Sequence, residues 1–353
     1  MYCSKLILPF LGVLLFLVEP GYSQWQQTNG PYGGVVRAFA ISGNNIFVGT
    51  DGNDGVYLST SNGKSWTAVN TNLQNNHMRS LALSGINLFA GTDVNGVYLS
   101  TNSGKSWTAV NTGLNDGTIN ALTVRDTKLF AGTYGGVFLS TNNGTSWNAV
   151  NNGLTNTSVY SIAFSGTNLF AGTYRGVFLS TDNGASWTQR GLTSSTVYAL
   201  GVSGTNLFAG TNGNGVYLST NNGVSWTSAN TGLINTNVRC FAFSGANLFA
   251  GTEGGGVFRS TNNGISWTTV NTGLTNSSVY ALAFFGTDLF AGTYGDGIYS
   301  SSDNGANWTQ IGLTITYISS LAVSGTNLFA GTNGGIGGLF LSTNNGTSWT
   351  AVN

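Results

Sequence analysis

An octapeptide that ends in tryptophan recurs eight times along this chain and constrains the fold more than any other feature. It reads Ser-x-(Asn/Asp/Ser)-x-Gly-x-x-Trp, and its successive tryptophans lie 41, 40, 40, 39, 41, 41 and 41 residues apart. So regular a spacing is typical of repeat proteins, in which each repeat forms one structural unit. The copies are Ser59–Trp66, Ser100–Trp107, Ser140–Trp147, Ser180–Trp187, Ser219–Trp226, Ser260–Trp267, Ser301–Trp308 and Ser342–Trp349.

The fourth repeat indicates what that unit is. Val159–Phe164 and Leu169–Tyr174 alternate between large and small or polar residues, with a turn between them. Val177–Ser180 and Trp187–Arg190 predict two further short strands, one on each side of the octapeptide. Four antiparallel strands repeated about every 40 residues are typical of a β-propeller blade. The sequence therefore predicts an all-β, eight-bladed propeller of four-stranded antiparallel blades over residues 35–353.

Alternation also predicts which side chains share a face of a blade. A face of large side chains is expected to pack against the face of small side chains on the next blade. Cys240 stands where the other repeats have Ala or Ser, so we interpret it as a small core residue and not as a nucleophile. In the fourth repeat the predicted large face holds Tyr160, Ile162, Phe164 and Phe170, and the small face holds Ser161, Ala163 and Ala171.

The chain is unusually poor in charge. Charged residues make up 6% of it and balance to a formal net charge of zero. Such a surface offers no basic patch for nucleic acid or acidic lipid. Hydrophobic residues make up 41% of the chain, which is enough to close a core. We therefore expect a folded protein whose partner is not a nucleic acid.

The first 23 residues differ in composition from the rest. Lys5 precedes an apolar run, Leu6–Val18, and small residues follow at Gly21–Ser23. This pattern predicts a secretory signal peptide over residues 1–23, cleaved after Ser23, with an uncleaved anchor as the alternative. The mature protein is then secreted, periplasmic or extracellular and has no integral membrane segment, because no later segment is apolar enough. Cys240 would be its one cysteine, so no intrachain disulfide is expected.

Residues 24–34 contain a strand-like segment, Trp25–Asn29, that resembles the fourth strand of a blade. The last repeat already has its own fourth strand, Trp349–Asn353. The extra segment either displaces that strand and closes the ring with the N-terminus or lies outside the last blade. The sequence leaves both arrangements open.

The octapeptide resembles the Asp-box, or bacterial neuraminidase repeat, and its eight copies carry that resemblance over residues 35–353. Its glycine permits a positive φ, and its third residue accepts backbone N–H bonds inside the turn. The chain departs from the Asp-box at this third position, where Asp occurs only at Asp182 and Asp303. Asn or Ser in the other copies preserves the turn, but a metal-binding role is not expected.

The resemblance implies membership of the Asp-box propeller superfamily. That superfamily includes sialidases, xyloglucan-cleaving hydrolases, the sortilin ectodomain and the photosystem II assembly and stability factors, and its box is a fold element on the face away from the active site. The repeat style here is most similar to the assembly and stability factors and to sortilin-like propellers. Because one fold hosts many functions, the resemblance predicts the fold and leaves the activity open.

Two positions vary while the residues around them repeat, and both are predicted on the rim opposite the octapeptides. They lie 14 residues apart, and every Arg at the first position is matched by an acid at the second. If the turn between the first two strands has three residues, the two members of a pair face each other across a hairpin. The pairs either stabilise the rim or form a ring of aromatic and charged groups at the channel mouth, suited to a sugar or a peptide. The pairs are Arg37 with Asp51, Arg79 with Asp93, Asn120 with Tyr134, Tyr160 with Tyr174, Tyr198 with Asn212, Arg239 with Glu253, Tyr280 with Tyr294, and Ser319 with Asn333.

A catalytic constellation is harder to find in this sequence. A sialidase-like site needs an arginine cluster, but each arginine of the variable pairs has its own carboxylate partner. A glycosidase needs two carboxylates that flank one bond. Asp93 and Asp116 are the nearest candidates, with Asp54 and Asp296 elsewhere, and Asp116 lies in an Asn-Asp-Gly turn. His77 is the only histidine, which argues against a multi-histidine metal site.

We therefore predict no catalytic residues, no metal and no cofactor. The chain is interpreted as an exported, non-catalytic propeller that acts as a binding or scaffold module for a protein or glycan ligand. The alternative is a carbohydrate-active enzyme, either sialidase-like or another glycoside hydrolase.

Overall fold

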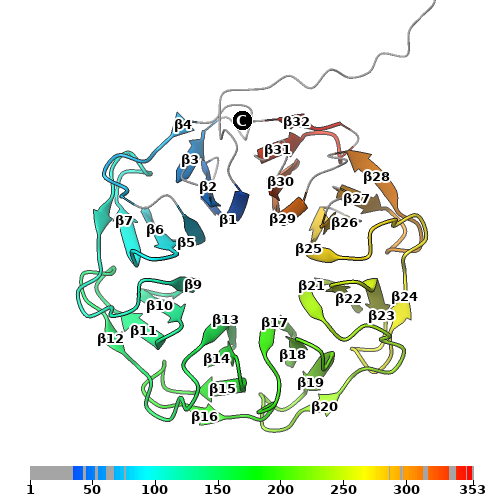
Figure 1. The fold of residues 1–353 in the computed structure, drawn as a ribbon, viewed down its shortest axis with the longest axis horizontal. Helices are drawn as coiled ribbons and strands as arrows, with labels where there is room; N and C mark the ends of the chain where they lie inside the picture. The colour runs from blue at the N-terminus through cyan, green and yellow to red at the C-terminus, as the bar shows by residue number, and fades with distance from the viewer. Residues whose placement is uncertain are drawn as a thin grey trace, which may run out of the picture.

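The computed structural model describes residues 35–42, 45–51, 55–60, 67–74, 77–285, 287–294, 296, 298–312, 317–333, 339–346 and 348–351. These residues form eight sheets, each of four antiparallel strands, and no helix. Figure 1 shows the sheets arranged as blades around a central axis, with the first strand of each blade innermost. The predicted eight-bladed, all-β propeller is confirmed.

The strands of each blade follow one another in the chain and in the sheet. Their bounds, blade by blade, are β1 Val35–Ser42, β2 Asn45–Asp51, β3 Val56–Ser59, β4 Thr67–Ala68; β5 Met78–Ser84, β6 Asn87–Thr92, β7 Val97–Ser100, β8 Thr108–Ala109; β9 Ile119–Arg125, β10 Lys128–Thr133, β11 Gly136–Ser140, β12 Asn148–Ala149; β13 Val159–Ser165, β14 Asn168–Thr173, β15 Gly176–Ser180, β16 Thr188–Gln189; β17 Val197–Ser203, β18 Asn206–Thr211, β19 Val216–Ser219, β20 Thr227–Ser228; β21 Val238–Ser244, β22 Asn247–Thr252, β23 Gly256–Ser260, β24 Thr268–Thr269; β25 Val279–Phe285, β26 Asp288–Thr293, β27 Ile298–Ser301, β28 Thr309–Gly312; β29 Tyr317–Ser324, β30 Asn327–Asn333, β31 Leu339–Ser342, β32 Thr350–Ala351.

The ring closes where the last blade meets the first. Ile46 and Tyr57 of the first blade share a core cluster with Phe329 and Leu339 of the last blade. Within the described residues each of these two blades is built from four strands of its own. The segment Trp25–Asn29, predicted either to close the ring or to lie outside it, falls outside the described residues.

The second strand of each blade is buried on both faces, which explains its composition. In β14 every residue from Leu169 to Thr173 is buried. Gly172 in this strand is required by a close approach, because a Cβ there would meet Ser161 Oγ and would lie 2.9 Å from Val197 Cγ1 of the next blade. The repeated Leu-Phe-Ala-Gly-Thr sequence therefore fits a strand sandwiched between two blades, with glycine at the tightest point.

The turn between the first two strands has two residues, so the three-residue turn that would place the paired residues directly opposite each other is not formed. Ser165 pairs with Asn168, and the register places Ile162 opposite Ala171 and Ala163 opposite Phe170. Residues directly opposite each other share a face, so the predicted faces are also wrong for Phe170 and Ala171. The reason is that a slip of one residue moves a strand's side chains to the other face of the sheet.

Each face of a blade therefore mixes large and small side chains. Phe170 packs into the cluster shared with blade 5, which contains Val197 and Ala209. Leu169 and Ala171 pack on Phe130 of blade 3. The large residue of one strand thus lies beside the small residue of its neighbour, and the space between blades is filled on both sides.

The octapeptides form the turns between the third and fourth strands. In the second copy, Ser100 Oγ accepts the Gly104 N–H at 2.7 Å and donates to Asn102 Oδ1 at 2.9 Å. Asn102 Oδ1 also accepts the Ser106 N–H at 3.0 Å. Gly104 has a φ of 82°, which favours glycine. The motif is therefore a self-contained hydrogen-bonded turn.

In the copies that the structure describes, the tryptophan of the octapeptide joins its blade to the blade before it. Trp147 is 3% exposed, and its indole Nε1–H donates to Val110 O of the preceding blade at 2.6 Å. The same bond forms from Trp107, Trp187, Trp267 and Trp308. Trp226 and Trp349 have buried indole nitrogens without a hydrogen-bond partner among the described residues. The tryptophans thus hold the ring together by packing and, in most described copies, by a hydrogen bond.

Cys240 lies on β21, where it packs against the core cluster between blades 6 and 7. Burial raises the pKa of its thiol to about 12. A thiol with such a pKa stays protonated at neutral pH and is a poor nucleophile. This placement fits the prediction of a small core residue.

Candidate functional site

The first position of every variable pair lies at a β-bulge. In blade 4 the register passes from Val159 opposite Thr173 to Ser161 opposite Gly172, and Tyr160 is the extra residue. A bulge interrupts the strict alternation of side chains and turns the extra one in a new direction. The bulged residues are Arg37, Arg79, Asn120, Tyr160, Tyr198, Arg239, Tyr280 and Ser319.

The bulges bring the two variable positions together, although the paired residues do not lie directly opposite each other across the hairpin. The Asp93 N–H donates to His77 O at 3.1 Å, so Asp93 lies opposite the residue two before Arg79 and not opposite Arg79 itself. Arg79 still reaches it, with Nη2 3.8 Å from Asp93 Oδ2. Arg239 forms an ion pair with Glu253 as well. Two of the three predicted pairs of an arginine with an acid, Arg79–Asp93 and Arg239–Glu253, are therefore confirmed as ion pairs.

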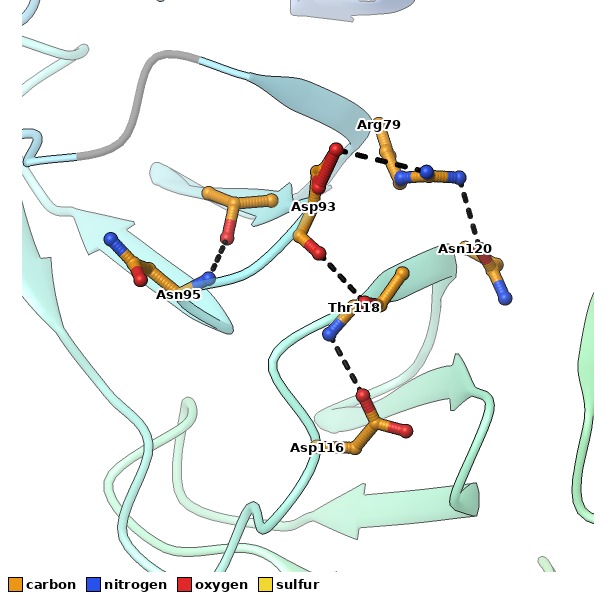
Figure 2. A network of polar contacts seen from close by, with 7 residues as sticks. Arg79, Asp93, Asn95, Asp116, Thr118 and Asn120 are labelled. Atoms are coloured by element: carbon orange, nitrogen blue, oxygen red, sulfur yellow. Dashed lines mark hydrogen bonds and ion pairs between the residues drawn. The ribbon is translucent and has the colours of Figure 1, made fainter.

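Figure 2 shows the polar network around Arg79 and the loop that enters blade 3. Arg79 Nη1 donates to Asn120 Oδ1 of the next blade at 3.3 Å. Thr118 Oγ1 donates to the Asp93 carbonyl at 2.7 Å, and the Thr118 N–H donates to Asp116 Oδ1 at 2.9 Å. The second carboxylate oxygen of Asp116 accepts the N–H of Gly135. Asp116 therefore orders a turn, as its Asn-Asp-Gly sequence indicates.

The arginine of the second ion pair is flanked by two aromatic rings. Arg239 Nε donates to Glu253 Oε2 at 2.9 Å, and its guanidinium carbon lies 4.4 Å from the ring centroid of Tyr198 and 5.6 Å from that of Tyr280. Burial alone would lower the pKa of Arg239, but the hydrogen bond and charge of Glu253 raise it. The bond from Arg239 holds the pKa of Glu253 below its usual value. Both groups stay charged at neutral pH.

Tyrosines continue this line of contacts on both sides of Arg239. The ring of Tyr160 lies 6.1 Å from that of Tyr134 and 5.5 Å from that of Tyr198, edge to face in both cases. Tyr280 lies 5.5 Å from Tyr294. Burial is the largest cause of the raised pKa of Tyr160, and the neighbouring Tyr134, Tyr198 and Tyr174 raise this pKa further. The Tyr160 phenol is therefore a neutral hydrogen-bond donor and acceptor at neutral pH.

These contacts form a continuous belt along the inner strands from blade 2 to blade 7. Asn120 connects Arg79 to the tyrosines of this belt. Its Oδ1 accepts a hydrogen bond from Arg79, and its Nδ2 donates to Val159 O, next to Tyr160, at 2.9 Å. We call this belt the rim arc. It consists of Arg79, Asn120, Tyr134, Tyr160, Tyr198, Arg239, Tyr280 and Tyr294.

The remaining predicted site residues are placed differently. Tyr174 lies near Tyr160 and is 53% exposed, and Asn212 is exposed beyond the end of β18. The side chains of Arg37, Asp51, Ser319 and Asn333 lie outside the described part of the chain, so their predicted pairing stays a prediction. Asp54 is likewise outside the described residues, and Asp296 accepts a hydrogen bond from Thr275.

Sequence reasoning missed two elements of this rim. The bulge was missed because a single extra residue leaves the 14-residue spacing unchanged. Arg175, exposed beside Tyr174, was missed because it does not belong to either variable position. A signal for Arg175 was present, since it stands where the third repeat has Gly135 and no other repeat has a cation.

The described residues hold neither a metal-binding cluster nor a membrane-spanning helix. No three or more His, Cys, Asp or Glu side chains gather there as a metal site requires. None of these residues forms a helix with the length and apolar character needed to span a bilayer.

The comparison with known proteins places the chain in a family. Three overlapping stretches, residues 19–155, 136–241 and 231–353, match the DUF6242 beta propeller domain. The chain belongs to this family. No curated protein matches the sequence.

Solved structures share the fold at low sequence identity. Sqt1 of Saccharomyces cerevisiae has a TM-score of 0.68 and 14% identity over 90% of this chain and 98% of its own. YCF48 bound to D1 peptide has a TM-score of 0.57 and 15% identity over 77% of this chain and 94% of its own. A GH74 xyloglucanase from Xanthomonas campestris has a TM-score of 0.57 and 14% identity over 93% of this chain and 68% of its own. At such identities the likeness concerns the fold alone.

Proposed function

We propose that this propeller is an exported, non-catalytic binding or scaffold protein that holds a protein or glycan ligand on the rim arc. The observation that carries the proposal is the continuity of the arc, in which residues of successive blades contact one another around the inner rim from Arg79 to Tyr294. Export rests on the signal-peptide pattern of residues 1–23.

The chemistry of the arc suits recognition. Tyr134 and Tyr294 are 43% and 52% exposed, so their rings offer apolar surface with a polar hydroxyl at its edge. Neighbouring rings and the Arg239–Glu253 pair hold the other side chains in place before any ligand arrives. Binding to pre-ordered side chains has a lower entropic cost than binding to mobile ones.

The motif and one of the two candidate acids, Asp116, favour binding over hydrolysis. We interpret the octapeptide as an Asp-box, whose role is to close the turn and brace the neighbouring blade. Asp93 is engaged by Arg79, and both carboxylate oxygens of Asp116 accept backbone N–H bonds. Asp116 is thus committed to ordering its turn, whereas Asp93 keeps a buried oxygen, Oδ1, that has no hydrogen-bond partner among the described residues, so Asp93 is the acid that an enzyme would use. A carbohydrate-active enzyme remains the alternative class.

Glycan and peptide arrays probed with the purified protein test this proposal. Each glycan that binds on the array is then incubated with the protein, and the mixture is analysed for shortened products by mass spectrometry. We expect binding without product formation. Release of products at a rate proportional to protein concentration, abolished by Asp93→Asn, would favour the enzyme instead.

A further inference from the structure

A cleft of about 310 Å³ opens on the same rim beside blade 4. It is lined by the turn that joins β14 to β15 and by the loop that leads from β16 to β17. The lining residues are Tyr174, Arg175, Thr193, Ser194 and Thr196.

The loop that borders the cleft is two residues shorter than most of its counterparts, and only the equivalent loop between Trp308 and Ile318 is as short. Trp187 and Val197 are 10 residues apart, whereas Trp147 and Val159, the equivalent residues of the previous repeat, are 12 apart. The shorter loop is firmly held. The Gly176 N–H donates to Ser195 O at 2.9 Å, and Asn214 Nδ2 donates to Ser195 Oγ at 2.9 Å. The cleft is therefore bounded by an ordered backbone on both sides.

Arg175 differs from the two arginines of the rim arc in its charge balance. Arg79 and Arg239 each have a carboxylate partner. Arg175 is exposed, its backbone N–H and C=O bond to Thr173 Oγ1 and Gln189 Nε2, and no described carboxylate lies within 4 Å of its guanidinium. The cleft thus presents one positive charge that the described residues leave uncompensated.

The lining indicates the kind of ligand. A guanidinium binds a carboxylate or sulfate through paired N–H donors. The hydroxyls of Thr193 and Ser194 are exposed and match hydroxyl groups on a ligand, while the ring of Tyr174 offers a face to the C–H groups of a pyranose. Peptide anchors are mostly aromatic or aliphatic side chains that fill apolar pockets, and this polar cleft does not provide one.

We propose that this cleft is a subsite for the anionic group of an acidic saccharide, whose neighbouring sugar rings run over the rim arc. This inference rests on the proposed function and narrows its ligand to a glycan that bears carboxylate or sulfate groups. Tyr174 supports the sugar ring, Arg175 binds the anion, and Thr193 and Ser194 hydrogen-bond to the sugar hydroxyls.

Isothermal titration of the full chain with four oligosaccharides tests the subsite. The probes are an oligogalacturonate and its fully methyl-esterified form, and a sulfated galactan oligomer and its desulfated form. We expect at least one acidic probe to bind and its neutral counterpart to bind at least tenfold more weakly. Arg175→Gln should weaken the acidic probe by at least tenfold and leave the neutral one unchanged.

Lys105→Gln is the matched control, because it removes one exposed positive charge from an octapeptide instead of the cleft. It should leave all four affinities unchanged. The inference is overturned if neither acidic probe binds, if Arg175→Gln and Lys105→Gln have equal effects, or if only peptides bind. If only peptides bind, the proposed binding function stands and the saccharide subsite is excluded. If neither glycans nor peptides bind, both proposals are overturned.

Discussion

Arg239 of blade 6 stacks on Tyr198 of blade 5, with its guanidinium carbon 4.4 Å from the ring centroid, while its Nε donates to Glu253 of its own blade. A single side chain thus links two blades and closes an ion pair. Arg79 makes a looser pair with Asp93 at 3.8 Å and is 40% exposed. The two arginines occupy equivalent bulges and differ in how tightly they are held.

Arg239→Lys is expected to destabilise the propeller by about 1 kcal/mol, because lysine keeps the charge but loses the planar donor fork and the stacking face. Arg79→Lys is the control and should change the free energy of unfolding by less than about 0.5 kcal/mol, as is usual for exposed pairs. Urea unfolding of both variants measures the difference. Equal losses would contradict a special role for Arg239.

The indole hydrogen bonds between blades are tested by a pair of matched substitutions. Trp187→Phe removes the N–H that donates to Val150 O, whereas Trp226→Phe removes an N–H that has no partner among the described residues. Both changes remove similar apolar volume. Trp187→Phe should therefore cost about 1 kcal/mol more in the free energy of unfolding. A larger loss for Trp226→Phe would show that the bond does not stabilise the ring.

Asp303 makes part of the stability dependent on pH. The hydrogen bond from the Asn307 side chain, with a backbone bond from the same residue, lowers the pKa of Asp303 to about 2. An unfolded Asp titrates near about 3.9, so the folded state is favoured by the ionised group above that pH. This contribution should be complete above about pH 5 and should disappear as the pH falls through 4 towards 2.

Asp303→Asn is the matching variant, because Asn occupies the same position in five other octapeptides. Its urea-unfolding free energy should run parallel to that of the wild-type protein above pH 5. Below pH 4 the two curves should converge or cross, because only the wild type has a carboxylate at position 303 to lose. Parallel curves down to pH 2 would show that Asp303 does not contribute in this way.

The fold was predictable because the octapeptide and the alternation of apolar residues repeat eight times. The register was not, because the side-chain period of two leaves a one-residue slip invisible until the turn is seen. Phe170 and Ala171 were placed on the wrong faces for that reason. The Arg79–Asp93 and Arg239–Glu253 pairs were found from co-variation within the chain, and the bulges that join them were not, since they do not alter the spacing.

The candidate site also extends further around the ring than the pairs predicted within single repeats. Tyr160 was expected to meet Tyr174 of its own blade, yet its ring packs edge to face against Tyr134 and Tyr198 of the neighbouring blades. Such contacts depend on how blades are rotated about the ring axis, and a single repeat carries no information about that rotation. The rim arc is therefore a property of the closed ring.

The most direct test of the account is whether ligand binding depends on the rim arc. Arrays of glycans and peptides are probed with the wild-type protein, with Tyr160→Ala/Tyr198→Ala, and with Val224→Ala/Ile265→Ala, which changes two exposed octapeptide residues. Circular dichroism confirms that each variant is folded. We predict that the tyrosine variant loses array binding by at least tenfold and that the octapeptide variant retains it. Binding that survives the tyrosine substitutions, or that is lost only in the octapeptide variant, would contradict a ligand site on this rim.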